Sequence, residues 1–148
     1  MIPGPVPIAQ ECVEGYLYAV APLRLLLFRR PPARGRYWVP VSGKVDPTDP
    51  SWEAALRREL SEETGLSGAY PLEPLDWHVA FRSEAGPLWR LHAYAVRVDP
   101  AFVPRLSEEH DAFAWYSAEA AIEALHFPDN QDAVRRLRAV AAGRPATV

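Results

Sequence analysis

The sequence is poor in cysteine and carries little excess charge of either sign. Cys12 is the only cysteine among 148 residues, so no disulfide can form within the chain and nothing indicates an oxidising compartment. The formal net charge of -3 leaves no broad basic surface, which argues against a nucleic-acid polymer or an anionic membrane as partner. A substrate with several phosphates therefore needs local help, from a metal ion or from a few placed arginines.

Long apolar runs and targeting signals are also missing. Residues 1–10 contain no basic segment followed by an apolar stretch, so they do not resemble a signal peptide. The most apolar stretch, residues 16–28, is interrupted by Pro22 and Arg24 and is too short to span a bilayer. We therefore expect a cytoplasmic protein. The sequence leaves open whether it is a monomer or a homodimer. Its composition, 49% hydrophobic and 24% charged without repeats, is typical of one globular domain over residues 1–148.

Apolar periodicity predicts a mixed α/β domain of two or three layers. The strand-like runs are residues 11–20, 23–30, 36–41, 77–82, 88–98 and 113–116, the third ending in a turn at Ser42 and Gly43. Helical patterns cover residues 117–125 and 131–142, and a longer helix follows the loop at 46–51 and stops at Gly65. The candidate N-caps are Ser51 or Asp49 for the long helix, and Asp129 or Asn130 for the last one.

The long helix carries acids where its apolar face should lie. At about 100° per residue, Glu59, Glu62 and Glu63 share one arc with Trp52, Ala55 and Leu56, and the opposite side holds Ala54, Arg57, Ser61 and Thr64. Buried unpaired carboxylates are costly, and like charges four residues apart repel. Arg58 alone cannot neutralise three acids, whereas Mg²⁺ takes oxygen ligands and bridges carboxylates to phosphates. Two interpretations remain, a solvated acidic stripe or a site for a divalent cation.

The run GKVDPTDPSWEAALRRELSEETGL at residues 43–66 resembles the Nudix box. That pattern is Gly, five residues, Glu, seven residues, then Arg-Glu-aliphatic-x-Glu-Glu-x-Gly-aliphatic, and the second half matches at every position from Arg58 to Leu66. The first half departs from it, because Gly43 lies fifteen residues before Arg58 where the family has fourteen. Asp49 has the right distance from Gly43 to replace the first glutamate, so the loop carries an extra residue.

The resemblance implies a Nudix-type α/β/α sandwich around a mixed β-sheet, with the box as a catalytic loop–helix–loop. It implies Glu59 and Glu63 as principal metal ligands, Glu62 at a second metal position and Gly43 as a ligand through its backbone carbonyl. Arg58 is then the residue that holds the glutamates by a salt bridge. The implied reaction is Mg²⁺-dependent hydrolysis of a phosphoanhydride bond in a nucleoside-diphosphate-linked substrate, with Mn²⁺ as a possible substitute.

A later segment resembles one branch of this family. Ser107-Glu108-Glu109-His110, residues 113–117 and residues 127–131 are similar to dihydroneopterin triphosphate (or dATP) pyrophosphohydrolases and dinucleoside tetraphosphate hydrolases. The resemblance implies that Glu109 reaches the metals from the opposite wall and that Asn130 touches the base or pterin ring. The alternatives are a polar turn for residues 107–110 and an N-cap role for Asn130.

These features favour a nucleotide pyrophosphohydrolase whose substrate is a (deoxy)nucleoside triphosphate, a pterin triphosphate or a dinucleoside polyphosphate. Glu62, Glu63 and Glu109 are the candidates for the base that takes a proton from water. Arg29 and Ser42 are candidates for contacting the substrate, with Arg30 a weaker one. The alternatives are an ADP-ribose or nucleotide-sugar pyrophosphatase, a non-catalytic nucleotide sensor, and an interaction protein with an acidic patch.

Overall fold

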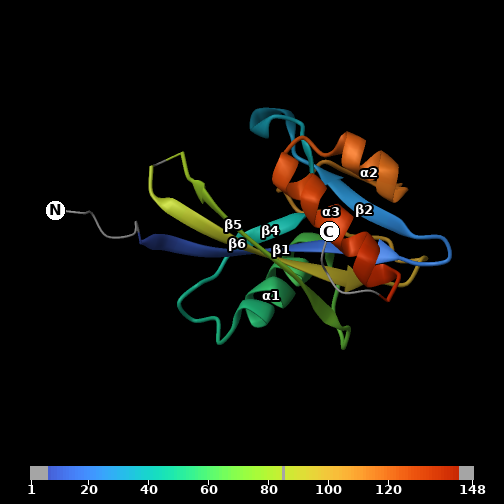
Figure 1. Ribbon diagram of the computed structural model, residues 1–148, viewed down its shortest axis with the longest axis horizontal. Coiled ribbons are helices and arrows are strands. Elements are labelled where there is room, and N and C mark those ends of the chain that lie inside the picture. The colour runs from blue at the N-terminus through green and yellow to red at the C-terminus, as the bar shows by residue number, and fades with distance from the viewer. Residues whose placement is uncertain (1–6, 85, 144–148) are drawn as a thin grey trace.

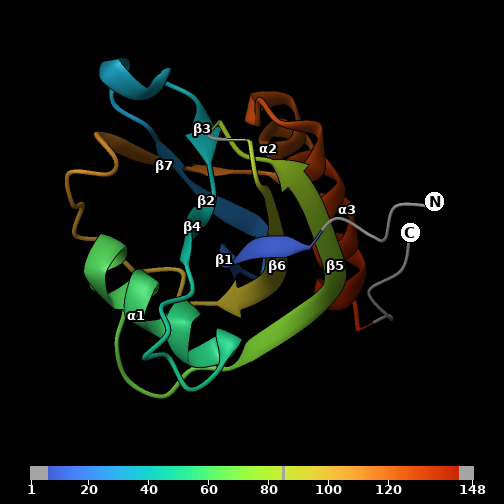
Figure 2. The same ribbon diagram turned by 90° about the vertical axis from the view of Figure 1, so that its left-hand side faces the viewer.

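Helices cover both faces of one mixed sheet in the computed structural model, which describes residues 7–84 and 86–143 (Figures 1 and 2). The described strands are β1 (Ile8–Ala19), β2 (Arg24–Arg29), β3 (Trp38–Val39), β4 (Val41–Lys44), β5 (Leu72–Arg82), β6 (Leu88–Arg97) and β7 (Ala112–Tyr116). The described helices are α1 (Trp52–Thr64), α2 (Ala118–Ala124), α3 (Pro128–Ala141) and the short 3₁₀ turn η1 (Pro32–Arg34). None of these helices is long and apolar enough to cross a membrane.

The long strand β1 organises the sheet. It pairs in parallel with β6 along one edge, and its other edge is shared between β4 and β2, both antiparallel. Residues 12–15 of β1 pair with β4 and residues 17–19 pair with β2. Pro40 lies where the chain passes from β3, which pairs with β2, to β4. The expected α/β fold with a mixed sheet is therefore confirmed.

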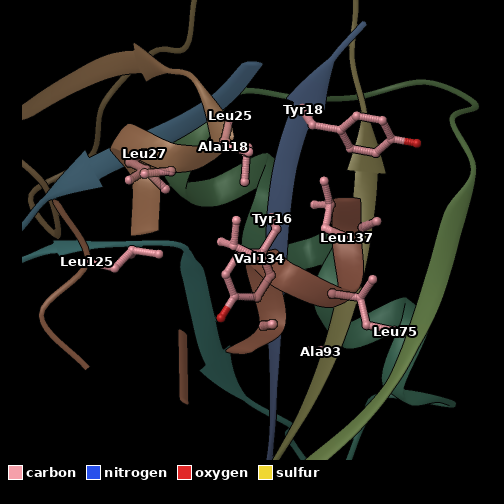
Figure 3. Close-up of a cluster of buried hydrophobic side chains, with 13 residues drawn as sticks. Tyr16, Tyr18, Leu25, Leu27, Leu75, Ala93, Ala118, Leu125, Val134 and Leu137 are labelled. Atoms are coloured by element: carbon pink, nitrogen blue, oxygen red, sulfur yellow. The ribbon is translucent and has the colours of Figure 1, made fainter. Parts of the chain in front are cut away.

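Alternation along β1 divides the core in two. Tyr16 and Tyr18 face α2 and α3 in one buried cluster, which Figure 3 shows, and Val13 and Leu17 face α1 in the other. Successive side chains of a strand point to opposite faces, so one strand supplies both layers. Figure 2 shows α1 on one side of the sheet and α3 on the other.

The ends of α1 follow the predicted signals. The Ser51 side chain accepts a hydrogen bond from the Ala54 amide at 3.0 Å, which satisfies one of the free donors at the helix N-terminus. Gly65 ends the helix at φ 76°, a left-handed conformation that glycine adopts without a steric penalty. Thr64, which the helical periodicity places opposite the acids, is buried, and its hydroxyl donates to the Leu60 carbonyl at 2.6 Å.

Three boundary predictions were wrong. Ser42 and Gly43 lie inside β4, where they pair with β1, and do not form a turn. α3 begins at Pro128, with Phe127 at the N-cap position, so neither Asp129 nor Asn130 caps it. β5 begins at Leu72, well before residue 77, because its pairing with β6 continues across an irregularity between residues 74 and 78 that disturbs the alternation.

Candidate active site

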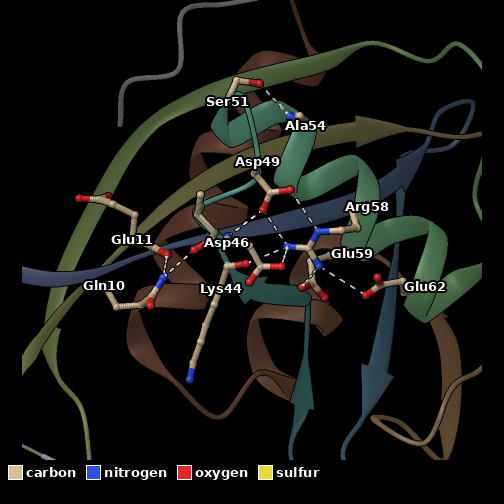
Figure 4. A network of polar contacts seen from close by, with 11 residues as sticks. Gln10, Glu11, Lys44, Asp46, Asp49, Ser51, Ala54, Arg58, Glu59 and Glu62 are labelled. Carbon is tan, nitrogen blue, oxygen red and sulfur yellow. Dashed lines mark hydrogen bonds and ion pairs between the residues drawn. The ribbon is translucent and has the colours of Figure 1, made fainter.

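Arg58 connects the loop before α1 to the acids on α1 (Figure 4). Its guanidinium donates to both carboxylate oxygens of Asp49, at 3.2 and 2.9 Å, and to the Lys44 carbonyl at 3.1 Å. It also donates to Glu59 at 2.9 Å and lies 3.5 Å from Glu62. The hydrogen bonds that Arg58 donates to Asp49 raise the pKa of Arg58 above its ordinary value, so this guanidinium keeps its charge.

Asp49 accommodates the extra residue of the loop. One of its carboxylate oxygens accepts a hydrogen bond from the Asp46 amide at 2.8 Å while the same carboxylate holds Arg58. Arg58 and this backbone amide lower the pKa of Asp49, which therefore stays ionised. Asp49 stands where the family pattern, counted from Gly43, has its first glutamate. Its contacts with Asp46 and Arg58 thus hold the loop that carries the extra residue.

Gly43 brings the β4 backbone against α1. A Cβ atom added at this position would lie 2.2 Å from the Cδ atom of Glu59, closer than atoms can pack. Only glycine allows β4 and the Glu59 carboxylate to approach in this way. The structure thus brings together Gly43, Arg58 and Glu59, as the resemblance implies.

Glu63 is the acid with the least compensation. It is only 6% exposed, and its Oε2 atom accepts no hydrogen bond from any described residue. Burial, and then the negative charges of Glu59 and Glu109, raise the pKa of Glu63 to about 8 from an ordinary 4.5. Burial also raises the pKa of Glu59, although Arg58 opposes the shift. Glu62, by contrast, is solvent-exposed.

Glu109 faces this group from the loop before β7. Its carboxylate forms an ion pair with Arg34 of η1, and its negative charge contributes to the raised pKa of Glu63. The next residue, His110, is buried against Phe28 at 5.2 Å between ring centroids, and burial lowers its pKa to about 4. A neutral, buried imidazole thus fixes the loop from which Glu109 projects. No local sequence signal pointed to Arg34, which pairs with Glu109 from another segment of the chain.

Arg29 ends β2, and Arg30 follows it directly. Arg29 forms an ion pair with Asp111 at 2.9 Å, which occupies part of its guanidinium. Arg30 is half-buried, and burial lowers its pKa, while the charges of Glu109 and Glu63 act in the opposite direction. Arg30 and Arg34 are therefore the arginines outside α1 whose charges act on Glu63 and Glu109.

Ser42 and Asn130, the two remaining candidates for contacting the substrate, lie on the face of the sheet opposite α1. Ser42 is half-buried and pairs in register with Glu14 of β1. Asn130 is 6% exposed and its amide nitrogen lies 2.9 Å from the Tyr16 hydroxyl and 3.5 Å from Glu14. Asn130 therefore belongs to a buried polar group that includes an acid absent from the sequence prediction.

The donor set fits a hard divalent cation. Within the described parts of the chain, no three acidic, histidine or cysteine side chains already surround a common point, since Arg58 holds Glu59 and Arg34 holds Glu109. The charges of Glu59, Glu109 and Glu62 nevertheless act on Glu63, whose buried oxygen has no partner and whose pKa is raised by burial and then by these charges. Oxygen ligands with excess negative charge are what Mg²⁺ and Mn²⁺ bind.

Comparison with known sequences places this geometry in a family. The sequence model of the NUDIX domain matches residues 19–137. A CTP pyrophosphohydrolase of Escherichia coli is 34% identical over 126 residues, which span 83% of this chain and 88% of that protein. An octanoyltransferase of Myxococcus xanthus is 41% identical over 119 residues, which span 78% of this chain but 32% of that protein. The chain thus spans about a third of the length of the octanoyltransferase.

Solved structures share the fold. An Ap4A hydrolase of C. elegans, solved as a binary complex, matches with a TM-score of 0.77 at 22% identity, covering 91% of this chain and 99% of that one. The dihydroneopterin triphosphate pyrophosphohydrolase of E. coli matches with a TM-score of 0.74 at 19% identity, covering 88% of this chain and 97% of that one. The family model and the bacterial relative agree with the box at residues 43–66: this chain belongs to the Nudix family.

Proposed function

We propose that this chain hydrolyses a phosphoanhydride bond in a nucleoside-diphosphate-linked substrate with the help of Mg²⁺, for which Mn²⁺ can substitute. The observation that carries the proposal is the buried Glu63 oxygen without a partner, next to Glu59 and within the electrostatic influence of Glu109. A nucleoside triphosphate, a pterin triphosphate or a dinucleoside polyphosphate is the preferred substrate class. The names of the CTP pyrophosphohydrolase and the Ap4A hydrolase support that preference.

The proposed roles of the residues come from the family resemblance, and the placement of the residues supports them. Glu59 and Glu63, with the Gly43 carbonyl, would hold the cation, and Glu62 would supply a further carboxylate. When bound, the cation supplies positive charge to the phosphates and acidifies water. Arg58 keeps Glu59 oriented, because it binds that carboxylate and the loop at once.

Cleavage of the bond needs a base that accepts a proton and cationic side chains that bind the phosphate oxygens. Water attacks one phosphorus, the bridging P–O bond breaks, and a carboxylate takes the proton of the water. Glu62 and Glu109 are accessible enough to take it, since both side chains are about half exposed, whereas Glu63 is buried. Arg30 and Arg34 stand beside the acids and would bind phosphate oxygens.

Acyl transfer is the second activity that a relative's name suggests. The octanoyltransferase match and the NUDIX match each cover about four fifths of this chain, so they overlap over most of it. The shared portion is therefore the Nudix domain. Cys12, the only thiol, is buried, and burial raises its pKa to about 11, which makes it a poor nucleophile. We therefore favour hydrolysis.

The substrate is identified by a screen. Nucleoside triphosphates, dinucleoside polyphosphates, ADP-ribose and nucleotide sugars are each incubated with the protein and Mg²⁺ or Mn²⁺, and released phosphate or pyrophosphate is measured. If only ADP-ribose or a nucleotide sugar is turned over, that compound class replaces the triphosphates and dinucleoside polyphosphates as the proposed substrate. Binding without turnover of any compound would indicate a nucleotide sensor.

Glu63→Gln is expected to lower turnover by orders of magnitude without unfolding the protein, because an amide cannot supply the negative charge that holds the cation. Glu123→Gln, an exposed acid on α2, is the matched control and should retain activity. Steady-state rates and thermal melting are measured on the same samples. A folded Glu63→Gln variant with normal activity would exclude the Nudix mechanism.

Mg²⁺ is expected to raise the melting temperature, since a ligand that binds only the folded state stabilises it by mass action. The cation also relieves repulsion among Glu59, Glu62 and Glu63. Replacing all three by glutamine should raise the melting temperature without Mg²⁺ and abolish the response to Mg²⁺. A response that survives the triple replacement would place the main metal site elsewhere.

In the metal-free protein, the contribution of Glu63 to stability is expected to be lost as the pH rises from about 4.5 to about 8. Folded Glu63 keeps its proton up to its raised pKa of about 8, whereas the unfolded chain releases it near 4.5. At this residue the folded state binds more protons in this window, so the contribution of Glu63 to the free energy of unfolding falls as pH rises. Urea unfolding in EDTA, measured across this range, should show the wild type losing stability relative to Glu63→Gln as the pH rises. Equal slopes would show that Glu63 is not the group responsible.

Glu109→Ala is expected to lower turnover at least about tenfold, or about 1.4 kcal/mol of barrier. The reason is that Glu109 faces the box acids although it lies on another loop. Glu108→Ala is the matched control and should have a much smaller effect, because Glu108 forms no ion pair among the described residues. Kinetics at saturating Mg²⁺ compare the two. Equal, small effects would mean that residues 107–110 form only a surface turn.

A further inference from the structure

A buried polar group that the proposed chemistry does not use lies between β1 and α3. It consists of Glu14, Tyr16 and Asn130, which are 4%, 1% and 6% exposed. Its position beside the N-terminus of α3 separates it from the acids of α1, which lie on the other face of the sheet.

The hydrogen bonds in this group all run toward Glu14. The Asn130 amide donates to the Tyr16 oxygen at 2.9 Å, and the Tyr16 hydroxyl donates to Glu14 Oε1 at 2.6 Å. The second oxygen, Glu14 Oε2, has only the Asn130 amide at 3.5 Å, the outer limit of a hydrogen bond. One acceptor of a buried acid is therefore left almost without a donor.

No cation compensates Glu14 among the ion pairs of the described residues, and the charged group that acts on it is the negative Asp129. Burial raises the pKa of Glu14 to about 7. A buried carboxylate in these surroundings is costly unless a donor reaches it. Apolar packing alone gives no reason for an acid at this position.

Glu14 is also close to the proposed site of cleavage. It pairs with Ser42, and the next residue, Gly43, is the one that contacts Glu59 from the other face of β4. Consecutive Cα atoms are about 3.8 Å apart.

We propose that Glu14 selects the heterocycle of the substrate by accepting a hydrogen bond from its exocyclic amino group, with Tyr16 and Asn130 as positioning residues. The inference rests on the proposed function and narrows its substrate class to amino-bearing bases or pterins. A carboxylate can only accept, so an amino group satisfies it, whereas a carbonyl at the same position brings two acceptors together. Leaving such a buried group unpaired is a strong basis for rejecting the wrong ligand.

Pairs of nucleotides that differ only by amino or carbonyl test this directly: CTP against UTP, and ATP against ITP. Values of kcat/KM are measured with Mg²⁺ above about pH 8, where Glu14, with its pKa of about 7, is charged. For at least one pair, the amino member should be preferred by roughly tenfold or more. Glu14→Gln should abolish or invert that ratio, because its amide can donate to a carbonyl, and the change should lie mainly in KM.

Asp129→Asn is the matched control, since it removes the neighbouring charge without touching the acceptor, and it should keep the ratio. Binding of the same nucleotides to Glu63→Gln, measured by titration calorimetry, gives a second readout that needs no turnover. Melting temperatures verify that each variant folds.

Equal kcat/KM within both wild-type pairs would overturn the role of Glu14, as would an unchanged ratio in a folded Glu14→Gln variant. If no nucleotide is turned over, the proposed function fails, and the calorimetric ratios still decide the question for Glu14. Absence of any binding would overturn both.

Discussion

The arrangement of the acids depends on the guanidinium of Arg58. This one side chain binds the end of β4 through the Lys44 carbonyl, the preceding loop through Asp49, and α1 through Glu59. Its planar set of donors can serve all three acceptors at once, which a lysine ammonium could not do in the same geometry. The loop can therefore carry an additional residue without moving Glu59, because Asp49 supplies the contact that fixes the loop to the helix.

Two arginines compensate part of the negative charge around α1. Arg58 holds Glu59 from one side, and Arg34 holds Glu109 from the other. Glu63 has no ion pair among the described residues, and burial, followed by the charges of Glu59 and Glu109, raises its pKa. The deficit of positive charge is thus concentrated at one buried oxygen, which is where a divalent cation would gain most from binding.

Much of the fold and part of the site could be predicted from local sequence signals. The cap at Ser51, the stop at Gly65 and the strand pattern of β1 depend on neighbouring residues, and the box fixes the relation of Arg58 to the acids. Pairings between distant segments left no such signal: Arg34 with Glu109, Arg29 with Asp111, and Asn130 with Tyr16. The cap assigned to Asn130 failed because Pro128 already starts the helix and Phe127 precedes it.

The difference between local signals and distant pairings also explains why the box predicts the type of reaction better than the substrate. Gly43 and Ser42 are neighbours on β4, yet their side chains belong to opposite faces of the sheet. Gly43 faces the acids of α1, and Ser42 pairs with Glu14 on the face that α3 covers in part. In the proposed function, residues of the box act on the phosphates from one face. Selection of the remaining part of the substrate is then assigned to β1 and α3, which contribute single residues such as Glu14 and Asn130 that stand outside the box.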